Sequence, residues 1–192
     1  MENKLTTTGY GIYLLSESRL EQFLKKNKVR SKKILESFQK NHALYLESLK
    51  EGVWVPIVPI QSAKYIIKVK NKDEVFSDEW EQVYKYEGFN LEIGENDDLW
   101  IGSFGSLLNF NKNDFSGEEQ SYETLDGNVL YKAFKYNVNK GKYLIDILGF
   151  KRITAMDFPN ANLGYQFLLH PVDDFEAYAD PRKDDRYVFN IQ

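Results

Sequence analysis

Hydrophobic positions in the first third of the chain recur with the spacing of amphipathic helices. Ser18 and Glu21 are spaced like a capping box, and Leu20, Phe23 and Leu24 give one apolar face, which predicts a short helix over residues 18–27. Between residues 31 and 51 apolar positions fall at steps of three and four, and Gly52 follows where a terminating glycine is expected. The pattern therefore predicts a second, longer helix over residues 31–51.

After Gly52 the hydrophobic period changes from that of a helix to that of a strand. Pro56 and Pro59 cannot donate ladder hydrogen bonds, so the first of these strands is predicted to be an edge strand or an extended crossing segment. Residues 81–93 are interpreted as two short strands around Glu87-Gly88. The predicted strands cover about 53–60, 63–70, 81–93, 99–108, 130–138, 143–148, 163–170 and 187–191.

One pair of strands has the pattern of a β-hairpin. Hydrophobic and polar residues alternate over residues 130–138, and Asn139-Lys140-Gly141 then leads into the apolar run of residues 143–148. We therefore predict that these two strands pair directly with each other.

The order of these elements predicts the fold class. Helices first and strands afterwards are typical of an α+β domain, here with N-terminal helices followed by a mostly antiparallel β-sheet, either as one sheet or as a β-sandwich. The length of 192 residues predicts a single domain over 1–192, with a helical segment at about 10–52 and a β-rich segment at about 53–192.

The amino-acid composition excludes several kinds of chemistry. The chain has no Cys and two His, which excludes disulfides, thiolate metal sites and Cys nucleophiles and leaves few ligands for a transition metal. It has neither a phosphate-binding glycine loop nor a G-x-S-x-G elbow. We therefore expect no catalytic residues, no cofactor and no bound metal, and we expect a protein that is not an enzyme.

The N-terminus is polar and no apolar run is long enough to span a membrane, so we expect a cytoplasmic protein without a membrane partner.

Charge is distributed unevenly along the chain. Residues 1–50 carry ten Lys or Arg and five Glu, a net charge of +5, whereas residues 51–192 carry 15 basic and 24 acidic residues, a net charge of −9. The basic run over residues 25–33 has enough cations to contact an anion or a nucleic acid, but a solvated loop between two helices explains it more simply. The acidic remainder instead favours a basic protein partner.

Carboxylates gather in three predicted loops of the acidic part, beside aromatic residues of the kind that anchor protein interfaces. We predict that these loops form the contact surface for the partner. The candidate partner-binding residues are Asp97, Asp98, Trp100, Glu118, Glu119, Asp173 and Asp174. The alternative hypothesis is a β-domain that binds a small molecule or carbohydrate, with Trp54, Trp80 or Trp100 stacked on the ligand.

The sequence of the predicted hairpin also resembles that of hairpins in other proteins. The segment Phe134-Lys135-Tyr136-Asn137-Val138-Asn139-Lys140-Gly141-Lys142-Tyr143-Leu144-Ile145 resembles hairpins in small bacterial immunity proteins and nuclease inhibitors. The resemblance covers some 15 residues and includes no catalytic signature. It implies a cytoplasmic inhibitor whose acidic surface blocks the basic substrate site of a nucleic-acid-degrading partner.

Overall fold

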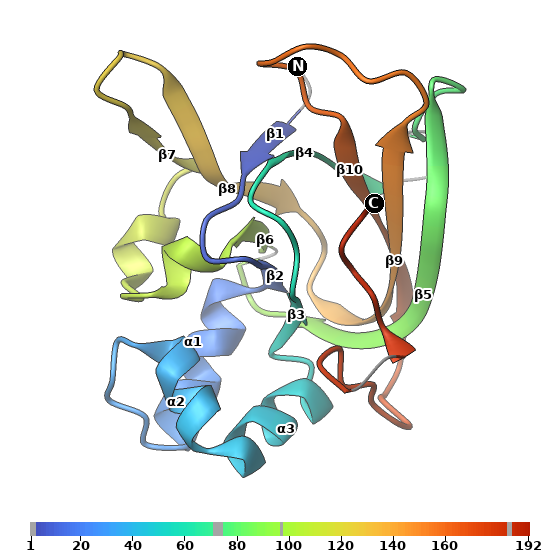
Figure 1. The fold of residues 1–192 in the computed structure, drawn as a ribbon. Coiled ribbons are helices and arrows are strands. Elements are labelled where there is room, and N and C mark those ends of the chain that lie inside the picture. The colour runs from blue at the N-terminus through green and yellow to red at the C-terminus, as the bar shows by residue number, and fades with distance from the viewer. Residues whose placement is uncertain (1–2, 71–74, 97, 184–185) are drawn as a thin grey trace.

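The computed structural model of the chain describes residues 3–70, 75–96, 98–183 and 186–192. A mixed β-sheet curls into a nearly closed, barrel-like shape, and three short helices lie together at one end of it (Figure 1). The N-terminal strands belong to this sheet, so the chain enters the barrel before it forms its helices.

The helices are α1 (Glu17–Lys26), α2 (Ile34–Lys40) and α3 (His42–Lys50). The strands are β1 (Asn3–Thr6), β2 (Ile12–Leu15), β3 (Trp54–Ile57), β4 (Lys64–Lys70), β5 (Trp80–Ile93), β6 (Asp98–Ser103), β7 (Glu119–Glu123), β8 (Val129–Asn137), β9 (Gly141–Arg152) and β10 (Leu163–Val172). Two 3₁₀ turns, η1 (Phe104–Leu107) and η2 (Lys112–Phe115), connect β6 to β7.

The strand order is β3-β2-β6-β8-β1-β4-β10-β9-β5, and β7 pairs with β8 outside this path. The β1–β8 and β4–β10 pairs are parallel, and the other pairs are antiparallel. The two end strands of the order approach each other, since the Glu92 N–H donates to the Gly52 carbonyl just before β3 at 2.7 Å. This contact nearly closes the sheet.

The inside of the barrel-like sheet is filled with apolar side chains. Alternate residues of the nine strands in this order point inward, as the two-residue period requires, and they form one buried cluster. The C-terminal segment completes this cluster with Phe189 and Ile191, both fully buried. Tyr165 donates a hydrogen bond to the Phe189 carbonyl at 2.9 Å, and burial holds the pKa of the Tyr165 hydroxyl well above its usual value. The interior is therefore packed with side chains, including those of the last residues of the chain.

The helices cover the outer face of β2, β3 and β6. Tyr13, Trp54 and Trp100 point outward from these strands into a second buried cluster formed with the three helices. Trp54 stacks on Phe38 of α2 with ring centroids 5.1 Å apart. Each of these strands is thus buried on both faces, which explains why their apolar runs show no alternation of polar residues.

The predicted fold class is wrong. The structure is mostly sheet, with N-terminal strands that precede the helices and two parallel pairs, and it forms a nearly closed barrel-like sheet in place of a sandwich. Because β1 and β2 are only four residues long and lie beside polar and glycine residues, the helical periodicity that follows them dominates the pattern.

The predicted helix over residues 31–51 is two helices in the structure. The break falls at Asn41, whose backbone is extended and whose side-chain oxygen accepts a hydrogen bond from the Leu44 N–H at 3.1 Å. Asn at this position satisfies a free N–H at the start of α3, which competes with a continuous helix. The short helix predicted over residues 18–27 is confirmed as α1.

The predicted hairpin of residues 130–148 is also wrong. Both segments are strands, but β8 pairs with β6, β7 and β1, whereas β9 pairs with β5 and β10. The predicted last strand, residues 187–191, is an extended segment without strand pairing. Both errors arise because strand partners are chosen by contacts far apart in the sequence.

Candidate functional site

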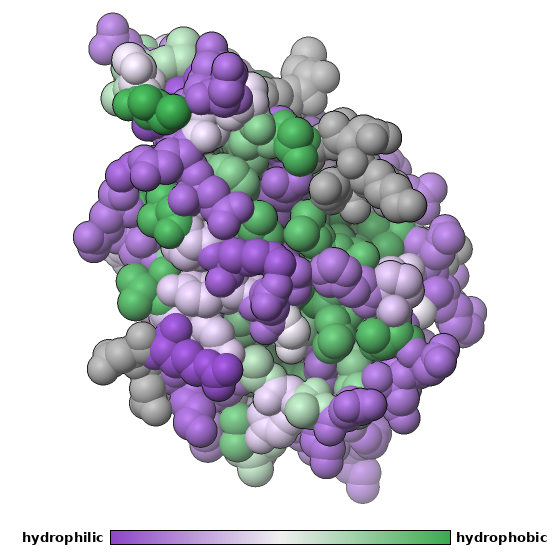
Figure 2. Space-filling view, turned by 90° about the vertical axis from the view of Figure 1, so that its right-hand side faces the viewer, coloured by the Kyte–Doolittle hydropathy of each residue, from purple (hydrophilic) through white to green (hydrophobic). Residues whose placement is uncertain are grey.

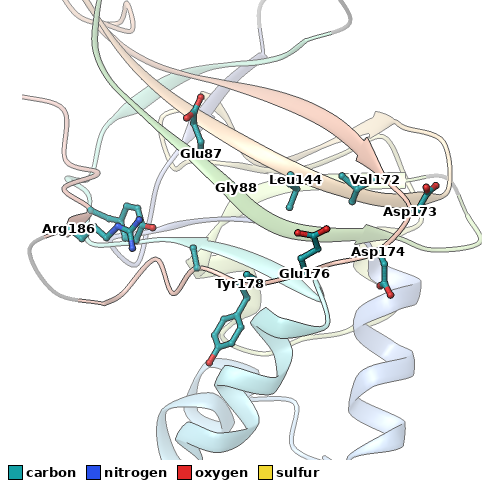
Figure 3. Close-up of a pocket in the computed structure, with 12 residues that line it drawn as sticks. Glu87, Gly88, Leu144, Val172, Asp173, Asp174, Glu176, Tyr178 and Arg186 are labelled. Carbon is teal, nitrogen blue, oxygen red and sulfur yellow. The ribbon is translucent and has the colours of Figure 1, made fainter.

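A cleft of about 870 Å³ opens on the outer side of β5, β9 and β10 (Figure 3). Its strand-borne lining includes Leu144 and Val172, and the loop that follows β10 forms another wall. At this point β5 is bulged, with a register shift between Tyr86 and Phe89 around Gly88. The complete lining is Glu87, Gly88, Leu144, Val172, Asp173, Asp174, Glu176, Ala177, Tyr178, Ala179, Arg186 and Tyr187.

The loop after β10 is held against the sheet by specific contacts. Asn90 of β5 is buried, and its side-chain amide donates to the Ala177 carbonyl at 2.8 Å. The ring of Phe175 packs on Gly52, where a Cβ atom would lie 2.8 Å from the ring. These contacts place the acidic residues on either side of Phe175 at the cleft.

Further along, the same loop is attached to α3. The Tyr45 hydroxyl donates to the Asp180 carboxylate at 2.6 Å, and the Arg182 guanidinium lies 4.9 Å from the centre of the Tyr45 ring. Burial, followed by this hydrogen bond, raises the pKa of Tyr45 above its usual range, so Tyr45 remains a donor. The cleft wall therefore has anchors at both ends.

The cleft is electrically polarised. Asp173, Asp174 and Glu176 lie toward one end, and Arg186 lies at the other (Figure 3). Asp174 pairs with Lys142 at 2.7 Å, and this hydrogen bond is the main cause that lowers the pKa of Asp174. Within the described part of the chain, Asp173 and Glu176 have no ion-pair partner, and both are exposed. Two carboxylates are thus available at the acidic end.

A second polar cluster adjoins the cleft on the same face of the sheet. Asp146 is buried, and its Oδ2 atom lies 2.9 Å from His170 Nε2 and 3.2 Å from Lys85 Nζ. Lys85 also pairs with Glu87, which lines the cleft. This cluster balances the buried Asp146 charge with two neighbouring nitrogen groups.

The remaining predicted contact residues lie elsewhere. Asp98 and Trp100 are buried, and the Trp100 indole donates to Asp98 Oδ2 at 3.2 Å, so neither is on the surface. Glu118 and Glu119 are exposed; Glu118 precedes β7 and Glu119 is its first residue. Strand β7 lies on the opposite side of the fold from the loop after β10 (Figure 1). Asp97 lies outside the described residues. Of the predicted contact residues that the structure describes, only Asp173 and Asp174 therefore line the cleft.

Three charged residues of the cleft, Glu87, Glu176 and Arg186, are not among the predicted contact residues. Glu176 stands two residues after Asp174 in the same acidic segment, which is a signal that could have included it. Glu87 joins the cleft only because of the bulge in β5, and Arg186 only because the chain returns past the cleft to the barrel interior.

The three tryptophans of the alternative hypothesis are buried in the structure. Stacking of a ligand on Trp54, Trp80 or Trp100 would require displacement of packed neighbours.

The lysines of the basic run are partly neutralised, since Lys25, Lys26 and Lys33 pair with glutamates of the helices.

Across residues 3–70, 75–96, 98–183 and 186–192, no three His, Asp or Glu side chains are grouped so that they could hold a metal ion.

None of the described helices has the length and apolar character needed to cross a membrane.

Comparisons with known proteins found no matching family, no similar curated protein and no similar solved structure.

Proposed function

We propose that the protein is a non-enzymatic binding module that docks a basic segment of a partner protein in the cleft beside β5 and β10. The observation that carries this proposal is the pair of exposed carboxylates, Asp173 and Glu176, without ion-pair partners among the described residues and above the apolar side chains of Leu144 and Val172. A lysine or arginine has the matching chemistry, because its apolar stem can cover such a floor while its cation meets the carboxylates.

We propose further that the module acts as an inhibitor or immunity protein, which neutralises a toxin or nuclease by one-to-one binding. The net charge of −9 over residues 51–192 supports this role, since nucleic-acid-degrading enzymes carry basic substrate sites. Complementary charge at the rim of an interface mainly speeds association and selects the partner.

Affinity capture from the native host at low ionic strength tests the proposal, with the captured protein then purified and assayed for nuclease or toxin activity. We expect that activity to fall linearly with added chain and to reach its end point at a one-to-one ratio. Replacement of both free carboxylates, Asp173→Asn with Glu176→Gln, should weaken binding about tenfold, in line with the loss of two exposed charge pairs.

The matched control is Glu118→Gln with Glu119→Gln, which removes the same charge at the start of β7 and should leave binding almost unchanged. Equal weakening by both double variants would show that only net charge matters and would contradict docking at the cleft. A captured partner that retains full activity at saturation would contradict the inhibitor role.

A further inference from the structure

A second hollow, of about 660 Å³, lies on another part of the surface, between the β7–β8 hairpin and the loop that joins β9 to β10. We refer to it as the hairpin groove. It opens where β1 and β8 diverge, since these parallel strands share only the Leu5–Tyr131 register pair. The groove is lined by Thr6, Thr7, Ser62, Ala63, Lys64, Thr124, Asp126, Asn128, Leu130, Phe158, Pro159 and Asn160.

Two large apolar side chains beside this groove are exposed to solvent, and Lys64 Nζ lies 5.0 Å from the centre of the Phe158 ring. Leu125, in the turn of the hairpin, is fully exposed, and Phe158, on the opposite wall, is 87% exposed. The hairpin itself projects from the body of the fold (Figure 1). A projecting apolar residue and an apolar-lined hollow therefore occur side by side in the same chain.

We propose that the hairpin groove receives the β7–β8 hairpin of a second copy of this chain, so that two copies interlock about a two-fold axis. In such an isologous contact the same surface serves both copies, and a projection next to a hollow is the arrangement that the symmetry requires. The Leu125 side chain of each copy would then lie between Phe158 and Ala63 of the other.

The charges of the groove favour a second copy over other occupants. The chain as a whole carries a net charge of −4, so two copies repel each other at long range. The groove, in contrast, is lined by one cation and one anion, Lys64 and Asp126. Asp126 stands next to Leu125 in the turn, so insertion of the hairpin brings Asp126 of one copy toward Lys64 of the other.

The surface on the side of β5 is more hydrophilic than the surroundings of this groove. Seen from that side, hydrophilic residues surround scattered hydrophobic ones (Figure 2). The hairpin groove and the acidic cleft share no lining residue, so the proposed self-association uses a separate surface and does not depend on the proposed docking of a basic partner.

Sedimentation equilibrium over protein concentrations from about 1 µM to about 1 mM tests the proposal. We expect a monomer–dimer equilibrium for the unaltered chain and a dissociation constant at least about tenfold higher for Leu125→Asp. Because Leu125 is fully exposed, this change removes no buried contact. Leu108→Asp is the matched control: Leu108 is 60% exposed, the substitution adds the same charge, and dimerisation should be retained.

The absence of cysteine from the chain permits a direct test of the geometry. A mixture of the Leu125→Cys and Ser62→Cys variants, oxidised at dimer-forming concentration, should yield a disulfide between position 125 of one copy and position 62 of the other. A mixture of Leu108→Cys and Ser62→Cys should not yield the corresponding product. A monomer at every concentration, a dimer that persists in Leu125→Asp, or no 125–62 product would overturn the proposal.

Discussion

Lys142 Nζ lies 2.7 Å from Asp174 Oδ1, so strand β9 holds the acidic loop in place at one end of the cleft. The neighbouring Asp173 has no such partner among the described residues. The two consecutive aspartates therefore have different roles: Asp174 positions the loop, and Asp173 is available to a partner.

This difference predicts unequal effects of two isosteric substitutions. Asp173→Asn should weaken partner binding about threefold to fivefold without changing the thermal midpoint, because one exposed charge pair is lost. Asp174→Asn should loosen the loop, which hydrogen exchange of the Phe175 and Glu176 amides would detect. Binding unaffected by Asp173→Asn at low salt would count against the assignment.

The Lys142–Asp174 pair also has a defined pH dependence. The pair lowers the pKa of Asp174 in the folded state, so its contribution to stability is present above the unfolded pKa of about 3.9 and is lost as the pH falls through the lower folded value. The loop amides should therefore lose their protection against hydrogen exchange only in strongly acidic solution. Loss of loop order already at pH values near neutrality would contradict this role.

Arg19 connects the helical layer to the sheet. Its Nε donates to Glu92 of β5 at 2.7 Å and its Nη2 to Glu51 after α3 at 2.9 Å, with the Arg19 side chain only 14% exposed. We expect Arg19→Ala to lower the free energy of unfolding by about 2 kcal/mol, because the partly buried Glu92 loses its ion-pair partner and Glu51 keeps only its pair with Lys26. Urea denaturation measures this change. Arg30→Ala, at an exposed position of the basic run, is the control and should have little effect.

Glu17 is a buried carboxyl group at the start of α1, and its Oε1 atom has no hydrogen-bond partner in the described residues. Burial, and then the nearby charge of Glu21, raises its pKa in the folded state. A raised pKa means that the folded state favours the protonated form. Stability from this group is therefore fully present below the unfolded pKa of about 4.3 and is lost as the pH rises through the folded value.

Glu17→Gln should accordingly stabilise the protein at pH 7 by about 1 kcal/mol and have less effect at pH 4. Unfolding at the two pH values checks the prediction. A substitution that destabilises equally at both would show that the carboxylate is ionised and satisfied in the fold.

The C-terminal segment is predicted to be essential to the barrel-like sheet. Phe189 is fully buried among the inward-pointing residues, and its carbonyl accepts a hydrogen bond from Tyr165. Phe189→Ala should cost about 3–5 kcal/mol, the usual loss for a large aromatic side chain removed from a core. Val188→Ala is the control, because the adjacent Val188 is exposed. Comparable losses for both variants would contradict the inward packing of Phe189.

The sequence allowed several elements to be predicted, for reasons that are local. Helix α1 has one apolar face, and β4 alternates so that Tyr65 and Ile67 point inward, as expected from the two-residue period. The capping box predicted at Ser18 and Glu21 is wrong, because the N-cap residue of α1 is Ser16 and its side chain makes no capping hydrogen bond. Pro56 and Pro59 predicted either an edge strand or an extended crossing segment, and the place of β3 at the end of the strand order confirms the first of these alternatives.

The remaining features depend on contacts that no local pattern contains. Strands β8 and β9 follow each other in the chain, yet β1, β4 and β10 lie between them in the sheet. The acidic cleft was predicted only through Asp173 and Asp174. Glu87 reaches it through a bulge in β5, and the burial of Asp98 depends on its hydrogen bond with Trp100.

The docking of a cation in the cleft can be observed residue by residue. In a titration of the ¹⁵N-labelled chain with a lysine- and arginine-rich peptide, followed by NMR, we expect saturable shifts of the amides of Asp173, Asp174, Glu176, Gly88 and Leu144 that weaken as salt is added. Shifts confined to the Glu119–Glu123 strand, or spread evenly over all exposed carboxylates without saturation, would contradict it.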